Sequence, residues 1–119
     1  MPPPEDLDRL RHMVASAQEA IGYAAERSRG DLDSDRQLEH SLVRLVGIVG
    51  EAAGRLSPAT RAMAPELPWP SMVSMRNRLI HDYDRVDLNV VWDTVTVDLP
   101  GLVPQLERLV EAVENSSTS

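Results

Sequence analysis

Apolar residues recur at alternating steps of three and four along three long segments of this 119-residue chain. A helix turns about 100° per residue, so this spacing places them on one side and predicts three amphipathic helices. They run from about Asp6 to Arg29, from about Ser34 to Leu56, and from Leu102 toward the C-terminus. The apolar stripes of the first two are Leu7, Leu10, Val14, Ala17, Ile21 and Ala24, and Leu38, Leu42, Leu45, Val49, Ala52 and Leu56.

Proline, glycine and capping residues divide the rest of the chain. Gly30 is predicted to close the first helix, and the segment 31–34 supplies turn and cap residues for the second. Further helices are predicted over Pro58–Ala64, Pro70–His81 and Leu88–Val97, the last capped by Asp87. The β-branched residues of 88–97 suit a strand as well. We expect a break at Leu99-Pro100-Gly101 and a frayed tail over 115–119.

Three glycines, Gly47, Gly50 and Gly54, share one side of the second predicted helix. Each costs about 1 kcal/mol relative to alanine inside a helix. We therefore favour an interpretation in which another backbone packs closely against that side.

Composition favours one globular domain over residues 1–119, with flexible ends at about 1–5 and 115–119. Hydrophobic residues make up 42% of the chain and charged residues 26%, and there is no cysteine. No apolar run is long enough to span a membrane, and the N-terminus is unlike a signal peptide, so we expect a cytoplasmic protein. The net charge of −7 argues against non-specific binding to nucleic acid and gives no reason to expect DNA as a partner.

The segment from Met72 to Tyr83 concentrates the residues that carry chemistry. On a helical wheel Arg76 falls within the apolar stripe, whereas Arg78 falls on the opposite, solvated side. An arginine on an apolar face keeps its proton and needs an anionic partner, either a carboxylate of the fold or a phosphate of a ligand. His81 lies on a third side, so in one straight helix it would not meet Arg76; the two converge only if the helix ends near Ile80 or a second subunit completes the site.

Other polar residues are given structural interpretations. Glu51 and Arg55 lie one turn apart, as in a surface ion pair. His12 and His40 lack partners at metal-ligand spacing and are assigned no function. Asp82 and Asp84 are interpreted as solvated, and Asp87 as a cap.

The motif Arg76-Asn77-Arg78-Leu79-Ile80-His81-Asp82-Tyr83 resembles that of HepT-like toxins of the HEPN superfamily: an arginine, four residues, a histidine, any residue and a tyrosine. The resemblance extends over about residues 38–109. It includes the segments Gly50-Glu51-Ala52-Ala53, Leu56-Ser57, Pro65-Glu66-Leu67-Pro68-Trp69, Asp84-Arg85-Val86-Asp87, Val91-Trp92 and Leu99-Pro100.

The resemblance implies an all-α, up-and-down bundle of four to five main helices, with 88–97 helical. It implies the toxin of a type II toxin–antitoxin system, a homodimeric endoribonuclease that cleaves RNA without metal or cofactor. Arg76 and His81 would be catalytic and Asn77 supporting. Tyr83 would be adenylylated (AMPylated) by a cognate minimal nucleotidyltransferase antitoxin. Glu51 would lie near Arg76.

A second hypothesis stays open: a non-catalytic helical dimer that binds a nucleotide or a protein partner. The paired Arg76 and His81 favour the enzyme, whereas the acidic net charge favours the binding module.

Overall fold

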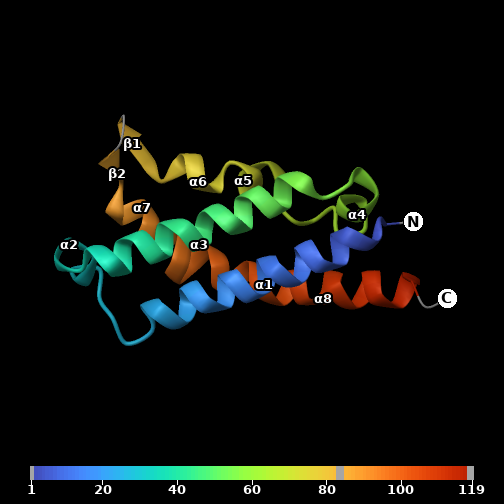
Figure 1. The fold of residues 1–119 in the computed structure, drawn as a ribbon, viewed down its shortest axis with the longest axis horizontal. Helices are drawn as coiled ribbons and strands as arrows, with labels where there is room; N and C mark the ends of the chain where they lie inside the picture. Colours follow the sequence, from blue (N-terminus) through green and yellow to red (C-terminus); the bar gives the residue numbers. More distant parts are fainter. Residues whose placement is uncertain (1, 83–84, 118–119) are drawn as a thin grey trace.

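The computed structural model describes residues 2–82 and 85–117 and shows an up-and-down bundle of helical segments, here called legs (Figure 1). The first leg is α1 (Pro4–Ala24) and the second is α3 (Arg36–Arg55), with the short α2 (Asp31–Ser34) between them. The third leg consists of α5 (Trp69–Val73) and α6 (Met75–Arg78). The fourth joins α7 (Leu88–Asp93), the π-helical η1 (Thr94–Asp98) and α8 (Leu99–Ser117). The predicted all-α fold is confirmed.

The predicted stripe of α3 forms the centre of the core. All its members are buried in one core with residues of α1 and α8, and α3 makes its most extensive contacts with α1 and α5. On α1 the buried side lies slightly differently from the prediction: Met13, Ser16 and Ala20 are buried, whereas Leu7, Val14 and Ile21 lie at its edge.

The first helix ends five residues earlier than predicted, at Ala24 rather than Arg29. Glu26, and not Gly30, adopts a left-handed conformation with a φ of 65°. Arg27 then bonds to both Asp31 and Asp35, at 3.2 and 2.8 Å, and so holds the turn against α2 and the start of α3. Asp35 caps α3 by accepting the Leu38 N–H. These contacts join separate segments and do not follow the helical repeat, so the periodicity of the sequence could not predict where the first helix ends.

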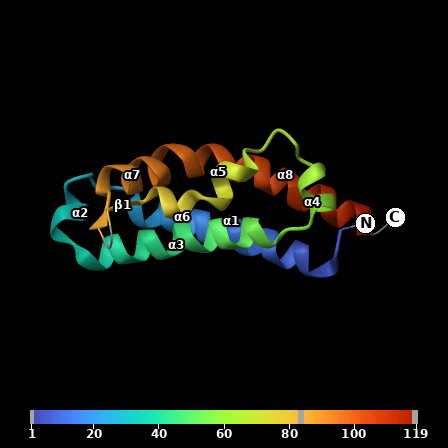
Figure 2. The same cartoon turned by 90° about the horizontal axis from the view of Figure 1, so that it is seen from above.

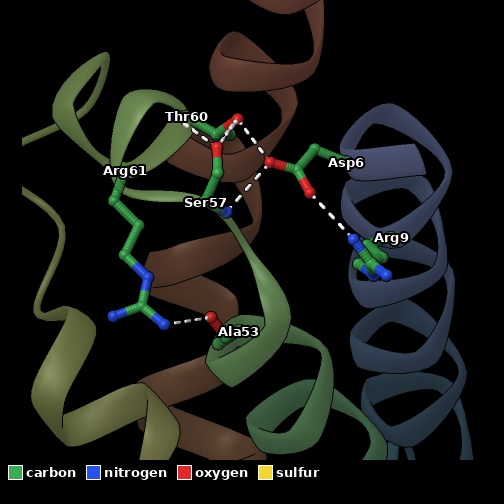
Figure 3. A network of polar contacts seen from close by, with 6 residues as sticks. All are labelled: Asp6, Arg9, Ala53, Ser57, Thr60 and Arg61. Atoms are coloured by element: carbon green, nitrogen blue, oxygen red, sulfur yellow. Dashed lines mark hydrogen bonds and ion pairs between the residues drawn. The ribbon is translucent and has the colours of Figure 1, made fainter. Parts of the chain in front are cut away.

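A buried carboxylate joins the first leg to the connection after α3 (Figure 3). Asp6 is fully buried and accepts hydrogen bonds from the Ser57 backbone N–H at 3.0 Å and the Thr60 hydroxyl at 2.6 Å. Arg9 adds an ion pair at 3.0 Å. Burial raises the pKa of Asp6, but these hydrogen bonds outweigh it and leave the pKa below its ordinary value. Ser57 also caps α4 (Pro58–Ala62), and Arg61 of α4 donates to the Ala53 carbonyl at the end of α3.

The third leg is interrupted, whereas one helix was predicted from Pro70 to His81. Ser74 forms a turn between α5 and α6, and its hydroxyl donates to the carbonyls of Pro70 and Ser71. A serine hydroxyl that bonds to nearby carbonyls competes with regular helix geometry. After α6 the chain becomes extended and forms a small antiparallel hairpin of β1 (Ile80–Asp82) and β2 (Arg85–Val86), with Ile80 opposite Val86.

The fourth leg is helical over 88–97, as the family resemblance implied, and Asp87 caps it by accepting the N–H groups of Asn89 and Val90. The predicted break at 99–101 is wrong. The Leu99 N–H bonds to Thr94 O, five residues back, so a π turn carries the helix past Pro100. The helix then accommodates Pro104 and continues to Ser117, beyond the predicted start of the frayed tail. Within the described residues no helix is long and apolar enough to cross a bilayer.

Candidate active site

Close contact between α3 and the third leg determines where Arg76 lies. A Cβ added at Gly50 would lie 3.0 Å from the Met72 carbonyl oxygen, and one at Gly47 would lie 3.1 Å from Cδ of Arg76. The glycine side of α3 therefore packs against another chain segment, as predicted. Gly50 admits the backbone of α5, and Gly47 admits the aliphatic stem of Arg76.

Arg76 is exposed, which corrects the prediction that it lies on a buried face. Because α6 is only four residues long, its apolar contact is limited to Met75 and the following Leu79, both buried. The guanidinium forms no hydrogen bond or ion pair with any side chain that the structure describes. Of the two anionic partners expected for Arg76, a carboxylate of the fold is therefore not found among the described residues.

The Arg76 side chain lines a groove of about 570 Å³ between α3, α6 and the hairpin. Arg36, His40 and Arg44 line it from α3 at intervals of one helical turn, and Val86 lines it from β2. The other lining residues are Glu39, Val43, Gly47, Ile48 and Glu51. Figures 1 and 2 show the hairpin after α6, at the end of the bundle that also carries α2 and α7. Three arginines and one histidine in its lining make this groove suited to bind an anion.

The two arginines of the motif are not equivalent. Arg78 donates to the Ser71 carbonyl at 3.4 Å and lines a different groove, of about 360 Å³, against α8. Asn77, the predicted supporting residue, is exposed on α6 between them.

His81 belongs to β1 and not to a helix, so the helix does end before Ile80, one of the two conditions for convergence with Arg76. Val86, which pairs with Ile80, lines the Arg76 groove, and the Asp87 N–H bonds to Leu79 O at 2.6 Å. The strand that carries His81 therefore begins directly after α6 and pairs with a strand at the groove. Tyr83, the predicted modification site, lies outside the described residues, as does Asp84.

Glu51 lines the Arg76 groove and accepts from Arg55 at 2.8 Å, so the predicted ion pair is present and Glu51 lies near Arg76 as the resemblance implied. His12 lines a separate groove of about 360 Å³ between α1 and α3. Among the residues that the structure describes, no three His, Asp or Glu side chains are placed to hold a metal ion.

Sequence reasoning missed the contribution of Arg36, His40 and Arg44. Their spacing, with two steps of four residues, places them on one side of α3, and this was the signal that could have identified them. His40 was assigned no function because only metal ligation was considered.

The fold and the groove define a small all-helical protein with a solvent-open, arginine-lined site beside a histidine-bearing hairpin. The family model described as "Ribonuclease HepT-like" matches residues 9–113. The chain therefore belongs to the HepT-like ribonuclease family, and its predicted enzyme class, an endoribonuclease, is confirmed by this membership.

Individual relatives agree with this assignment. A protein of Thermococcus cleftensis, described as "Probable ribonuclease HepT", is 37% identical over 81% of this chain and 88% of its own length. One from Caldanaerobacter subterraneus, described as "Putative RNase", is 28% identical over 86% of this chain and 91% of its own length. A Methanocaldococcus jannaschii protein, described as "Gamma-glutamylcyclotransferase and putative RNase", is 26% identical over 92% of this chain but half of its own length. No solved structure is significantly similar to the chain.

Proposed function

We propose that this protein cleaves RNA without a metal ion, using Arg76 and His81 at the groove. The observation that carries the proposal is the exposed Arg76 guanidinium, which lines an open groove and has no anionic partner among the described side chains. Because the chain belongs to a ribonuclease family, we take the anion that binds to Arg76 to be a phosphodiester of RNA.

The proposed reaction is an internal transfer at phosphorus. The 2′-oxygen of the substrate attacks the adjacent phosphate, and the bond from phosphorus to the 5′-oxygen of the next nucleotide breaks. The 2′-hydroxyl loses its proton and the departing 5′-oxygen gains one, so the products are a 2′,3′-cyclic phosphate and a 5′-hydroxyl. His81 transfers one of these protons, because imidazole exchanges protons near neutral pH. Arg76 binds two phosphate oxygens and stabilises the charge that develops on them. Asn77 helps to orient the phosphate.

The direct test is cleavage of RNA by the purified protein in the presence of a chelator, with analysis of the new ends. We expect cleavage to persist and to leave cyclic phosphates, and the His81→Ala variant to be inactive. Activity that disappears on chelation and returns with magnesium would overturn the mechanism.

We also propose that the protein is the toxin of a type II toxin–antitoxin system and acts as a homodimer. Its antitoxin would be a minimal nucleotidyltransferase that adenylylates Tyr83. In that reaction the phenol oxygen attacks the α-phosphate of ATP and pyrophosphate departs. The proposal is supported by the family membership and by the position of Tyr83, two residues after His81 in the segment that joins the hairpin strands.

Adenylylation is expected to inhibit cleavage, because the added phosphodiester can occupy Arg76 while the nucleoside blocks the groove. Tyr83→Phe should resist inhibition and retain cleavage. The measurement is incubation with the cognate nucleotidyltransferase and ATP, followed by mass spectrometry and a cleavage assay. Label on a different residue, or a modified protein that cleaves at the original rate, would exclude this role for Tyr83.

The binding module remains the second candidate, and the net charge of −7 favours it. Tight binding of RNA or a nucleotide with no cleavage under any condition would favour this alternative.

A further inference from the structure

The arginines of this chain divide into those with partners and those without. Five form ion pairs with carboxylates: Arg9, Arg11, Arg27, Arg29 and Arg55. Arg61 and Arg78 donate to backbone carbonyls. Arg36, Arg44, Arg76, Arg85 and Arg108 form no hydrogen bond or ion pair within the described part of the chain, and the first three of them line the same groove. In an acidic protein, a cluster of guanidinium groups that have no partner within the fold is suited to bind an anion from outside the protein.

Three cationic or polar side chains extend this groove along α3. Arg36, His40 and Arg44 are spaced by four residues, which corresponds to about 6 Å per step along the helix axis. They therefore form a row that leads away from the contact between Gly47 and Arg76. All three are exposed, so a ligand can reach them without a change in the fold.

Carboxylates near the row are mostly engaged elsewhere. Asp31 and Asp35 bind Arg27, and Asp33 binds Arg29. The hydrogen bond from Arg27 lowers the pKa of Asp35 below its ordinary value, so this pair remains ionised. Within the groove, Glu51 is bonded to Arg55, while Glu39 lies 3.8 Å from His40. The arginines of the row thus keep their charge available.

We propose that Arg36, His40 and Arg44 form a phosphate-binding row that holds the RNA backbone next to the phosphate bound by Arg76. This inference rests on the proposed function and extends its substrate site from one phosphate to several consecutive ones. The ligand is a single strand, whose successive phosphates can follow a row of donors along one helix. Among the described residues that line the groove none is phenylalanine, tyrosine or tryptophan, so the row is suited to bind the phosphate backbone rather than to stack on the bases.

The test measures binding separately from cleavage. A short, fluorescently labelled 2′-O-methyl oligoribonucleotide lacks the attacking hydroxyl, so its affinity is read by anisotropy over a range of salt concentrations. We expect Arg36→Ala and Arg44→Ala each to raise Kd about tenfold, as for the loss of one charge-assisted contact. Each should also reduce the salt slope by about 0.7, the value for one phosphate contact on a single strand.

Arg108→Ala is the matched control, because Arg108 is an exposed arginine of α8 that does not line the groove. It should bind as the wild type does. Unchanged affinity and slope in Arg36→Ala and Arg44→Ala would overturn the row, and so would an equal loss in Arg108→Ala, which would indicate a general effect of charge. The wild type could bind RNA but fail to cleave it. If the row variants then lose binding, the phosphate-binding row is upheld and the proposed function is rejected. Thermal unfolding of each variant verifies its fold.

Discussion

Arg76 is held by its aliphatic stem and not by its charge. The stem lies against Gly47, while the guanidinium remains exposed at the groove. A larger residue at position 47 would place a Cβ 3.1 Å from the stem and displace it. Gly47 on α3 therefore positions Arg76 on α6. The sequence alone gives no sign that these two residues are in contact.

Asp6 makes stability depend on pH. Its native pKa lies below the ordinary value, so its contribution is present above the unfolded pKa of about 3.9 and is lost as pH falls through the native pKa. Asp6→Asn should lower the free energy of unfolding at pH 7 by about 1–3 kcal/mol, because charge-assisted hydrogen bonds are weakened. Denaturant unfolding at pH 7 and pH 3 measures this.

The difference between wild type and Asp6→Asn should shrink at pH 3, while Asp8→Asn, an exposed neighbour on α1, should have little effect at either pH. A difference that is the same at both pH values would show that the charge of Asp6 is not the cause.

Packing between α3 and α5 depends on the missing side chain at position 50. Gly50→Ala gains about 1 kcal/mol of helix propensity, but its Cβ would lie 3.0 Å from the Met72 carbonyl oxygen and 3.4 Å from that of Val73. Backbone atoms cannot rotate away, so α5 must shift, and we expect a net loss of about 1–2 kcal/mol.

Gly22→Ala provides the comparison, because a Cβ on this glycine of α1 meets nothing within 4 Å. It should stabilise the protein slightly in the same thermal or denaturant unfolding experiment. If Gly50→Ala proved as stable as Gly22→Ala, the close approach of α5 would not constrain the fold.

The positions of helices could be predicted from the sequence where apolar residues repeat with a helical period. The residues at which helices end could not be predicted in this way. The stripe of α3 is confirmed because every member contributes to one core. The third leg is broken at Ser74, whose hydroxyl donates to carbonyls of the preceding turn, and the break expected at Pro100 is replaced by a π turn. Both outcomes depend on hydrogen bonds of single residues, which periodicity does not encode.

The candidate site was predictable only in part. The motif located Arg76 and His81 along the chain. The helical wheel, however, was drawn for one continuous helix, and it therefore wrongly predicted that Arg76 is buried. The row on α3 enters the site through tertiary packing, so these residues, which lie well before the motif in the sequence, were overlooked. Spacing within one element cannot reveal which other element will lie beside it.

For the molecule as a whole, we expect a homodimer in which Arg76 and His81 of both subunits line a shared cleft. A second subunit would complete the enclosure of a groove that is open on this chain. Light scattering at the concentration of the cleavage assay should report twice the 13.2 kDa mass of one chain. A fully active monomer would reject the shared cleft.

The proposed mechanism assigns the phosphate to Arg76 and not to its neighbour Arg78. Cleavage of RNA by wild type, Arg76→Ala and Arg78→Ala, measured side by side in chelator, tests this assignment. Removal of the charge that stabilises the transition state should reduce the rate at least 100-fold in Arg76→Ala. Arg78→Ala should retain most activity, because Arg78 lines the other groove. Circular dichroism confirms that both variants fold. Equal losses in two folded variants, or full activity without Arg76, would overturn this role for Arg76.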